Sequence, residues 1–242
     1  MNNTRGFTLV ELAIALMVIG LLIGGVLKGQ ELIENARTTS VVRELGAYDT
    51  AFIMFTSTYN EWPGKMKRPA SRLPNCTTLP CNYQYTSGAN KKRYWDTAIY
   101  DLINFWVHMQ RANLINSVVS EVSPSVFGNE WTTIKENAFG GYTRIYWSSY
   151  DGTSTLFYPN PEKAKNYYHI ANTLAGIYST TVLRYTMAID QKMDDGKPGT
   201  GSVINFFPVH GGESCWNLTT NEYNTEQRDR NCGIMLVQSA AN

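Results

Sequence analysis

The hydrophobic pattern of this 242-residue chain is dominated by one segment near its N-terminus. From Phe7 to Leu27 every residue is apolar or small except Thr8 and Glu11. A helix of about 20 apolar residues crosses a bilayer core of about 30 Å. The segment is longer than the apolar core of a secretory signal peptide, and no small-residue cleavage site follows it. We therefore expect a transmembrane helix and not a cleaved signal peptide.

The helical pattern continues beyond the membrane segment. Apolar residues recur there at steps of three and four, the period of a helix with one buried side. They are Leu45, Tyr48, Phe52, Phe55 and Tyr59. Pro63 disfavours a helical conformation at the residue before it, and Gly64 favours a turn. One helix is therefore predicted from Phe7 to about Asn60, on the order of 80 Å long at 1.5 Å per residue.

Glu11 is the one ionisable side chain inside the membrane segment. A carboxylate in hydrocarbon is costly, so an acid at such a position indicates a function that requires it. A nearby opposite charge would offset the cost, because unlike charges attract strongly where the dielectric constant is low. Glu11 is therefore the first candidate for a functional site.

Residues 63–242 contain both helix and strand signals, which predict an α+β head with an antiparallel sheet. An amphipathic helix is expected from Asp96 to Leu114. Residues 142–147 alternate as in a strand, and the turn dipeptide Asp151-Gly152 precedes a returning strand at 156–158. The other expected elements are a strand at 167–171, a helix at 179–193 and a strand at 202–209.

The composition indicates a folded protein without a strong electrostatic field. Hydrophobic residues make up 43% of the chain, charged residues 17%, and the formal net charge is +1. This balance argues against nucleic acid as a partner. The stretch from Lys91 to Trp95 joins basic and aromatic residues that could stack on nucleic acid, but a solvated loop end is the simpler interpretation.

Four cysteines form two pairs that are close in sequence. They are Cys76 with Cys81, and Cys215 with Cys232. Four cysteines allow three connectivities, and we favour the local pairs as structural disulfides formed in an oxidising compartment. Free thiols or a four-thiolate zinc site are the alternatives, although the spacings differ from the two-residue knuckles typical of zinc sites.

No familiar catalytic pattern is present. The chain has three histidines, His108, His169 and His210, and it lacks a nucleophile elbow, a phosphate-binding loop and a zinc-protease motif. His210 lies near Cys215 in the stretch HGGESC, but a disulfide with Cys232 explains that cysteine better. We therefore expect that the protein is not an enzyme.

Asp190, Asp194 and Asp195 are weak candidates for calcium ligands through their carboxylate oxygens. Their spacing differs from the alternating acids of an EF-hand loop. Two aspartates at a helix end before Gly196 more often form an Asx-type turn. No cofactor is therefore predicted, and calcium is the one alternative.

The segment RGFTLVELAIALMVIGLLIGGVL resembles the N-terminal signature of type IV pilins and of the pseudopilins of type II secretion systems. The resemblance implies that a prepilin peptidase cuts between Gly6 and Phe7 and methylates the new terminus at Phe7. It also implies that Glu11 is the assembly glutamate, paired with the Phe7 amine of a neighbouring subunit. An ion pair within one subunit is the alternative, because the two groups lie on one side of the same helix.

Two further stretches, FTSTYNEWPGKM and AIDQKMDDGKPGTGSV, resemble blocks of large pilin-like proteins of Gram-negative bacteria. Many family members carry a proline at the position of Lys28, where the helix kinks or melts during assembly. In this chain the helix-weakening residues are glycines, each costing about 1 kcal/mol relative to alanine. They are Gly20, Gly24, Gly25 and Gly29.

The pattern and the resemblance together divide the chain into four parts. We expect a leader peptide at 1–6, a transmembrane helix half at 7–27, an amphipathic helix half at 28–62 and a disulfide-closed head at 63–242. The expected function is a structural subunit of a type IV pilus or of a type II secretion pseudopilus, anchored by one span in the bacterial inner membrane with a periplasmic head. The implied partners are prepilin peptidase, other pilin or pseudopilin subunits and the inner membrane. The alternative is a minor pilin whose head binds DNA, a surface or a secreted substrate.

Overall fold

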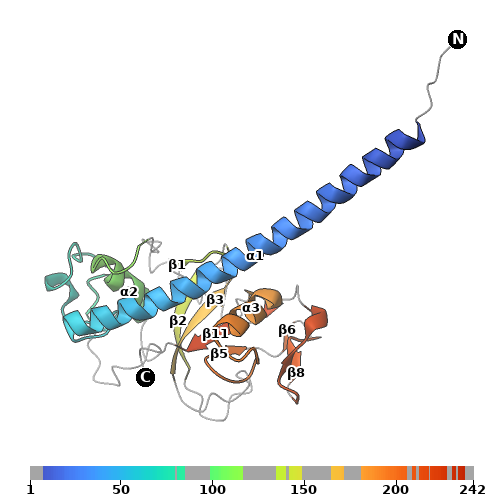
Figure 1. Cartoon of the computed structure of the whole chain (residues 1–242). Helices are drawn as coiled ribbons and strands as arrows, with labels where there is room; N and C mark the ends of the chain where they lie inside the picture. The colour runs from blue at the N-terminus through green and yellow to red at the C-terminus, as the bar shows by residue number, and fades with distance from the viewer. Residues whose placement is uncertain are drawn as a thin grey trace. The chain divides into compact units, whose positions relative to one another are not determined.

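The computed structural model forms two compact units, Met1–Arg37 and Thr38–Asn242, and each is described by itself. Figure 1 shows the elements in chain order. The structure describes residues 8–79, 81–84, 99–116, 135–139, 142–148, 165–171, 181–205, 209–210, 213–217, 219–227, 231–232 and 234–237.

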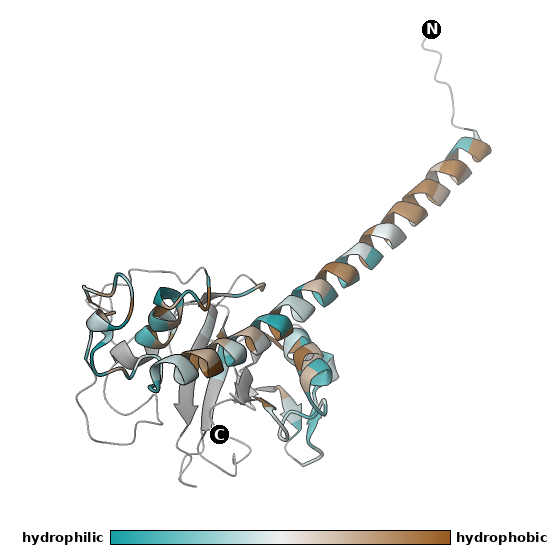
Figure 2. Cartoon of the chain, turned by 60° about the vertical axis from the view of Figure 1, so that its left-hand side comes forward, coloured by the Kyte–Doolittle hydropathy of each residue, from teal (hydrophilic) through white to brown (hydrophobic). Residues whose placement is uncertain are grey.

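Helix α1, Leu9–Tyr59, confirms the long N-terminal helix expected from the pattern. Within the first unit, every side chain from Leu9 to Leu27 is exposed, and Figure 2 shows the apolar character of this stretch. Among the described residues, α1 is the one helix long and apolar enough to cross a membrane.

In the second unit the same helix has one buried side. Its buried residues are Thr38, Val41, Leu45, Tyr48, Ala51, Phe52 and Phe55. The predicted stripe is confirmed up to Phe55, whereas Tyr59 is half-buried. Asn60, at φ 52°, and Gly64, at φ 81°, adopt the left-handed conformation that commonly ends a helix or turns the chain.

The described part of the head combines further helices with an antiparallel sheet, so the expected α+β class is confirmed. The helices are α2 (Ile99–Arg111), α3 (Leu183–Met193) and the short 3₁₀ helices η1 (Pro69–Ser71) and η3 (Thr225–Gln227). The five-stranded sheet has the order β1-β2-β3-β11-β5. Its strands are β1 (Lys135–Glu136), β2 (Tyr142–Ser148), β3 (Lys165–Ala171), β11 (Ile234–Val237) and β5 (Val203–Asn205). Smaller two-stranded pairs are β4 (Thr181–Val182) with β10 (Asn231–Cys232), β6 (Val209–His210) with β7 (Glu213–Ser214), and β8 (Trp216–Asn217) with β9 (Glu222–Tyr223).

The sheet is built on a long pairing between β2 and β3. The register runs from Tyr142 opposite Ala171 to Ser148 opposite Lys165. The returning strand expected at 156–158, and the turn before it, lie outside the described residues. On its other side β3 pairs with β11, a strand that the sequence analysis did not propose. A four-residue apolar run such as β11 is too short for its pattern to separate strand from helix.

Two predicted helix boundaries are wrong. The helix expected to start at residue 179 starts at Leu183, because residues 181–182 form β4 and pair with β10. The helix expected to reach Leu114 ends at Arg111, where Asn113 adopts a φ of 56° and the Leu114 amide bonds back to the Met109 carbonyl. A left-handed residue just past the last turn closes a helix in this way.

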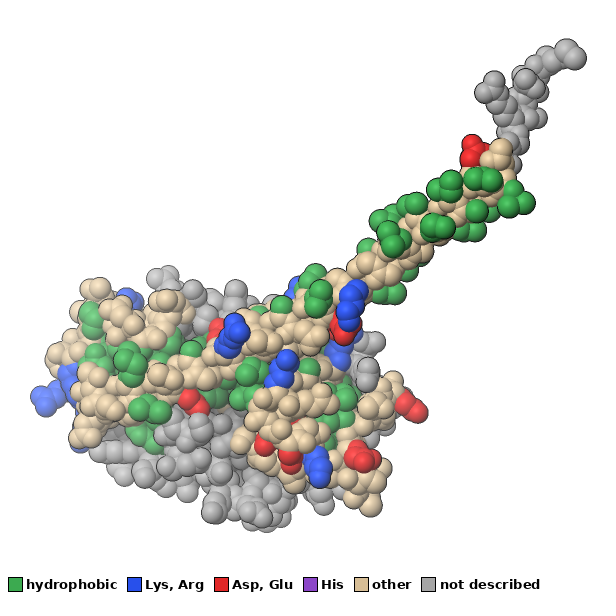
Figure 3. Space-filling view, viewed as in Figure 1, with side chains coloured by type: hydrophobic (Ala, Val, Ile, Leu, Met, Phe, Trp, Pro, Cys, Tyr) green, Lys and Arg blue, Asp and Glu red, His purple; other side chains and the backbone are tan. Residues whose placement is uncertain are grey.

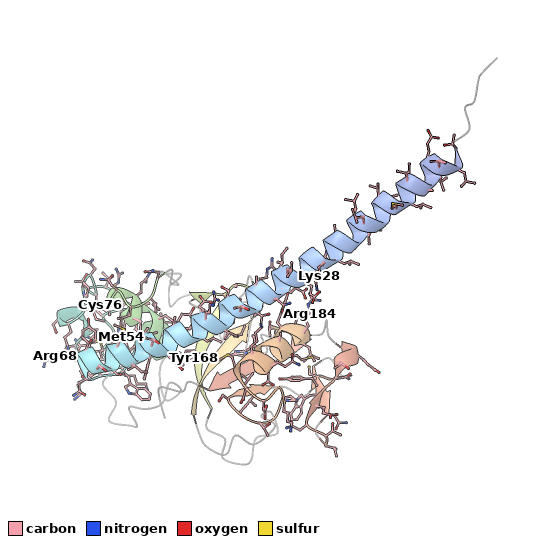
Figure 4. All side chains as sticks on the ribbon, in the orientation of Figure 1. Lys28, Met54, Arg68, Cys76, Tyr168 and Arg184 are labelled. Carbon is pink, nitrogen blue, oxygen red and sulfur yellow. A yellow bond between two sulfur atoms is a disulfide. The ribbon has the colours of Figure 1, made fainter. Side chains whose placement is uncertain are left out.

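Aromatic side chains from α1, α2 and β3 form the centre of the head's core. The Tyr48 ring meets the Trp106 ring edge-on at a centroid distance of 4.8 Å. Trp106 in turn lies 6.3 Å from the ring of Tyr168, which Figure 4 labels. The Tyr168 hydroxyl donates a hydrogen bond to Oδ1 of Asp49 at 3.0 Å. Large aromatic side chains dominate the free energy of such cores, so these contacts fix the second part of α1 on the head.

Candidate functional site at the start of the long helix

The first turn of α1 holds Glu11 in a reciprocal set of hydrogen bonds with Thr8. Oε2 of Glu11 accepts the backbone N–H of Thr8 at 2.8 Å and its hydroxyl at 2.9 Å. The Glu11 backbone N–H in turn donates to Oγ1 of Thr8 at 3.3 Å. A threonine followed three residues later by a glutamate, bonded in both directions, is a capping box. The acid is therefore fixed to the beginning of the helix.

The second carboxylate oxygen of Glu11, Oε1, accepts no hydrogen bond from the residues that the structure describes. The side chain is exposed, and the partial positive charge of the helix N-terminus favours an anion at this position. Glu11 therefore combines one oxygen engaged by its own helix with one oxygen available to another donor.

Gly6 and Phe7, the predicted processing residues, lie outside the described residues. Thr8 directly precedes the first residue of α1, so the predicted cleavage point lies just before the capping box in sequence. Cleavage between Gly6 and Phe7, and methylation of Phe7, stay predictions.

The first part of α1, on both sides of Glu11 in sequence, presents an apolar surface, which Figure 3 shows as a band of hydrophobic side chains along α1. Its exposed large apolar residues are Leu9, Val10, Leu12, Ile14, Leu16, Met17, Val18, Ile19, Leu21, Leu22, Ile23, Val26 and Leu27. Soluble monomers rarely expose so extended an apolar surface to water. The surface therefore suits a lipid environment or the apolar helices of other chains.

The predicted helix-weakening glycines do not interrupt α1, which is helical throughout from Leu9 to Tyr59. An added Cβ at Gly20, Gly24, Gly25 or Gly29 would meet nothing within 4 Å. Directly after the apolar run, Lys28 forms an exposed ion pair with Glu31 at 2.7 Å. An exposed pair of this kind contributes at most about 1 kcal/mol, so it adds little to the stability of the helix.

Cys76, labelled in Figure 4, forms the predicted disulfide with Cys81, and both residues are buried. The His108 ring of α2 lies against this loop. Its Nδ1 accepts the backbone N–H of Gly64 at 3.0 Å, so Nε2 carries the proton and donates to the Cys81 carbonyl at 3.0 Å. Burial lowers the pKa of His108 to about 4, so the ring is neutral at pH 7.

The two sulfur atoms and a ring nitrogen of His108 lie within 4.8 Å of one another, an arrangement that resembles a metal site. Metal binding by cysteine requires a thiolate, which a disulfide does not offer. Both ring nitrogens of His108 are also engaged. His108 is therefore a structural residue that ties α2 to the turn after α1 and to the disulfide loop.

Asp190, Asp194 and Asp195, the weak calcium candidates, are brought together, with carboxylate oxygens within 4.8 Å of one another. Asp190 is fully buried, and its oxygens accept the Tyr223 hydroxyl at 2.7 Å and the Gly196 N–H at 3.1 Å. Burial, and secondly the charges of the other two aspartates, raise the pKa of Asp190 to about 7 against the opposing effect of these hydrogen bonds.

The other two acids close the loop after α3. Asp194 accepts the backbone N–H groups of Ser202 and Val203. Asp195 accepts the N–H of Lys197 at 2.9 Å and the Thr200 hydroxyl at 2.6 Å. The hydrogen bond that the Lys197 amide donates to the Asp195 carboxylate closes the Asx-type turn expected from the sequence. Each of the three acids therefore accepts hydrogen bonds from protein groups, and calcium binding by them stays the alternative that the sequence offers.

The other sequence candidates are less fully described. Cys215 is buried and disulfide-bonded. The side chain of Cys232 lies outside the described residues, so the predicted pairing of these two cysteines stays a prediction. His169 is buried in β3, whereas the side chain of His210 and the stretch 91–95 lie outside the described residues.

Sequence reasoning missed the partners of two candidate residues. Thr8 was noted only as a polar exception in the apolar run, although a threonine three residues before a glutamate is the signal for a capping box. Tyr223 lies 33 residues from Asp190, and no local pattern joins them. The first partner could have been found in the sequence, and the second required the fold.

A long, exposed apolar helix followed by an α+β head is consistent with a pilin-like fold, and the first helix suits a membrane anchor. Residues 1–27 match the family model of the prokaryotic N-terminal methylation motif, the signature of type IV pilins and pseudopilins. The chain therefore carries the N-terminal signature of type IV pilin and pseudopilin precursors, and this signature implies a structural subunit that is processed by prepilin peptidase and assembled with other pilins. The chain showed no significant similarity to curated proteins or to solved structures.

Proposed function

We propose that this protein is a structural subunit of a type IV pilus or of a type II secretion pseudopilus. Prepilin peptidase removes residues 1–6, and the mature chain begins at Phe7 with a methylated amine. Residues 7–27 hold the subunit in the bacterial inner membrane, with its head in the periplasm, until it joins a filament. The methylation motif at 1–27 and the exposed apolar helix support this proposal.

The observation that carries the proposal is the placement of Glu11 at the beginning of the apolar helix, with one oxygen left available. A carboxylate among apolar side chains is costly unless a cation compensates it. Cleavage after Gly6 creates a cation, the ammonium of Phe7. When the apolar helices of several subunits pack together and exclude water, the ammonium of one subunit pairs with Glu11 of another, and the low dielectric constant strengthens the attraction.

Replacement of Glu11 with alanine tests this assembly role. Removal of a charge from an apolar segment favours membrane insertion, so the full-length variant should still be inserted and cleaved. Filament yield should fall by at least about tenfold, because removal of one partner of a buried ion pair leaves the other charge uncompensated. Glu31→Ala is the matched control, since Glu31 is an exposed acid on the same helix, and its yield should stay near that of the wild type. A normal filament yield from Glu11→Ala would refute the ion pair.

Replacement of Gly6 with leucine tests the processing step. A bulky residue directly before the cut should leave the leader on the chain, which an intact-mass measurement detects as the added mass of residues 1–6 without the methyl group of the mature Phe7. Gly20→Ala is the control, because an added Cβ there meets nothing within 4 Å and the chain should be processed normally. A mature wild-type chain that starts at a residue other than Phe7 would overturn the cleavage assignment.

The alternative function, a minor pilin whose head binds DNA, a surface or a secreted substrate, is supported by sequence alone. Its basic and aromatic stretch at 91–95 lies outside the described residues. Binding of the full chain in detergent to a DNA duplex at low salt, weakening as salt is added, would favour the DNA version. A lack of binding at low salt would exclude it.

A further inference from the structure

The capping box at the beginning of α1 holds Glu11 in place and still leaves one of its carboxylate oxygens able to meet a cation. Two donors of Thr8, its N–H and its hydroxyl, converge on one oxygen of Glu11, at 2.8 Å and 2.9 Å. The two oxygens of a carboxylate accept from different directions, so full engagement of Oε2 does not use Oε1. The cap and an external cation therefore do not compete for the same oxygen.

An unrestrained glutamate side chain samples several rotamers, and ordering it costs free energy when it binds a partner. Immobilising such a side chain at an interface costs about 0.5–1.5 kcal/mol. In this structure the two hydrogen bonds that Thr8 donates to Oε2 of Glu11 already fix the rotamer in the separate subunit. Part of the cost of placing the carboxylate is therefore met before a second subunit arrives.

We propose that Thr8 is a positioning residue for filament assembly: it holds Oε2 of Glu11 and so directs Oε1 toward the terminal ammonium of a second copy of this chain. This inference rests on the proposed assembly role of Glu11. Thr8 contacts no partner subunit in this scheme and acts only through the glutamate. Its hydroxyl also accepts the Glu11 N–H, an amide that would otherwise lack a protein acceptor in the first helical turn.

Three variants of the full chain separate the cap from the charge. Thr8→Val keeps the shape of the side chain but removes the hydroxyl. Thr8→Ser keeps the hydroxyl and so the cap. Glu11→Gln keeps acceptor oxygen for the Thr8 donors, as the capping box permits glutamine, but removes the negative charge.

Two measurements apply to each variant: filament yield in cells, and hydrogen exchange of the Glu11 backbone amide in detergent micelles. Thr8→Val should increase exchange and lower filament yield, each by about fivefold, the factor that corresponds to a typical cap substitution. Thr8→Ser should restore both to within about twofold. Glu11→Gln should keep the slow exchange yet lose the filaments, which a purely structural cap would not do. Intact mass should show normal cleavage in all three.

Wild-type filament yield from Thr8→Val would overturn the inference, as would a Thr8→Ser variant that fails as severely as Thr8→Val. A Thr8→Val chain that keeps its leader would also overturn it, because the residue would then act in processing. Failure of the proposed function is a separate outcome. If Glu11→Ala assembles normally, the ion pair is wrong. If Glu11→Ala is blocked while Thr8→Val is normal, only the role of Thr8 is wrong.

Discussion

Replacement of His108 with glutamine should change the pH dependence of stability more than it changes stability at pH 7. The neutral ring accepts from Gly64 through one nitrogen and donates to the Cys81 carbonyl through the other, both at 3.0 Å. Glutamine offers one acceptor and one donor and can keep either contact or both. The ring also stacks on Phe55 at a centroid distance of 6.4 Å, and this contact is lost. We expect a loss of about 1–2 kcal/mol at pH 7 from imperfect hydrogen bonds and lost aromatic packing.

The pH dependence follows from the pKa of His108, which burial lowers from 6.5 to about 4. Between these two values the unfolded chain binds a proton that the native ring excludes, so the native state loses stability as the pH falls. A difference of about 2.5 units corresponds to about 3 kcal/mol at 1.36 kcal/mol per unit. Above pH 6.5 the ring is neutral in both states and contributes no pH dependence.

The measurement is urea unfolding of the full chain in detergent micelles, followed by tryptophan fluorescence from pH 7.5 down to pH 4. Other acids titrate in the same range, but they are common to both proteins and cancel in the difference. The stability difference between the wild type and His108→Gln should be constant above about pH 6.5 and should move by about 3 kcal/mol in favour of the variant by pH 4. Parallel pH curves for the two proteins would refute a buried, neutral His108.

Three further predictions concern the head. Asp190→Asn should remove a titration whose pKa is raised from 3.8 to about 7. The wild type should therefore lose about 3 kcal/mol relative to this variant as pH rises from 4 to 7 in the same unfolding assay, and a pH-independent difference would contradict it. Gly201→Ala should lower the melting temperature by an amount equivalent to about 1–3 kcal/mol, because φ is +77° and the new Cβ would lie 1.8 Å from Oδ2 of Asp194. Gly46→Ala, on an open helix face, is its control and should be neutral or stabilising. Replacement of both Cys76 and Cys81 by serine should cost about 2 kcal/mol, the loop-closure value for so short a loop, as measured by urea unfolding against the wild type in a reductant-free buffer.

The long helix was predictable because its signal is local and repeated. The apolar run before Lys28 and the stripe from Leu45 to Phe55 each follow from spacing within one element, and α1 contains both. The sheet was less predictable because strand pairing depends on residues far apart in sequence. The partner of β3 is β11, and nothing near residue 168 indicates that it will lie opposite residue 236.

The candidate site shows the same division between local and distant information. Glu11 and the expected cleavage point were recognisable from a short motif, and the Thr8 cap could have been recognised from its three-residue spacing. His108 was expected to have no catalytic role, but its actual contacts with Gly64 and Cys81 bridge separations of 44 and 27 residues. Such contacts depend on how α2 packs against the loop, which no periodicity in the sequence describes.

The capping box does not by itself explain why residue 11 is an acid. Glutamine would accept the same two hydrogen bonds from Thr8, since the capping box is satisfied by either residue. A neutral amide would also cost less than a carboxylate in an apolar segment. Capping alone therefore does not require a charge at this position, although the helix dipole favours one. A carboxylate gains more where the position also meets a positive charge, and the amine that the proposed cleavage releases at Phe7 is a cation close to it in sequence. The proposed ion pair thus explains the charge of Glu11, and the cap with Thr8 explains its geometry.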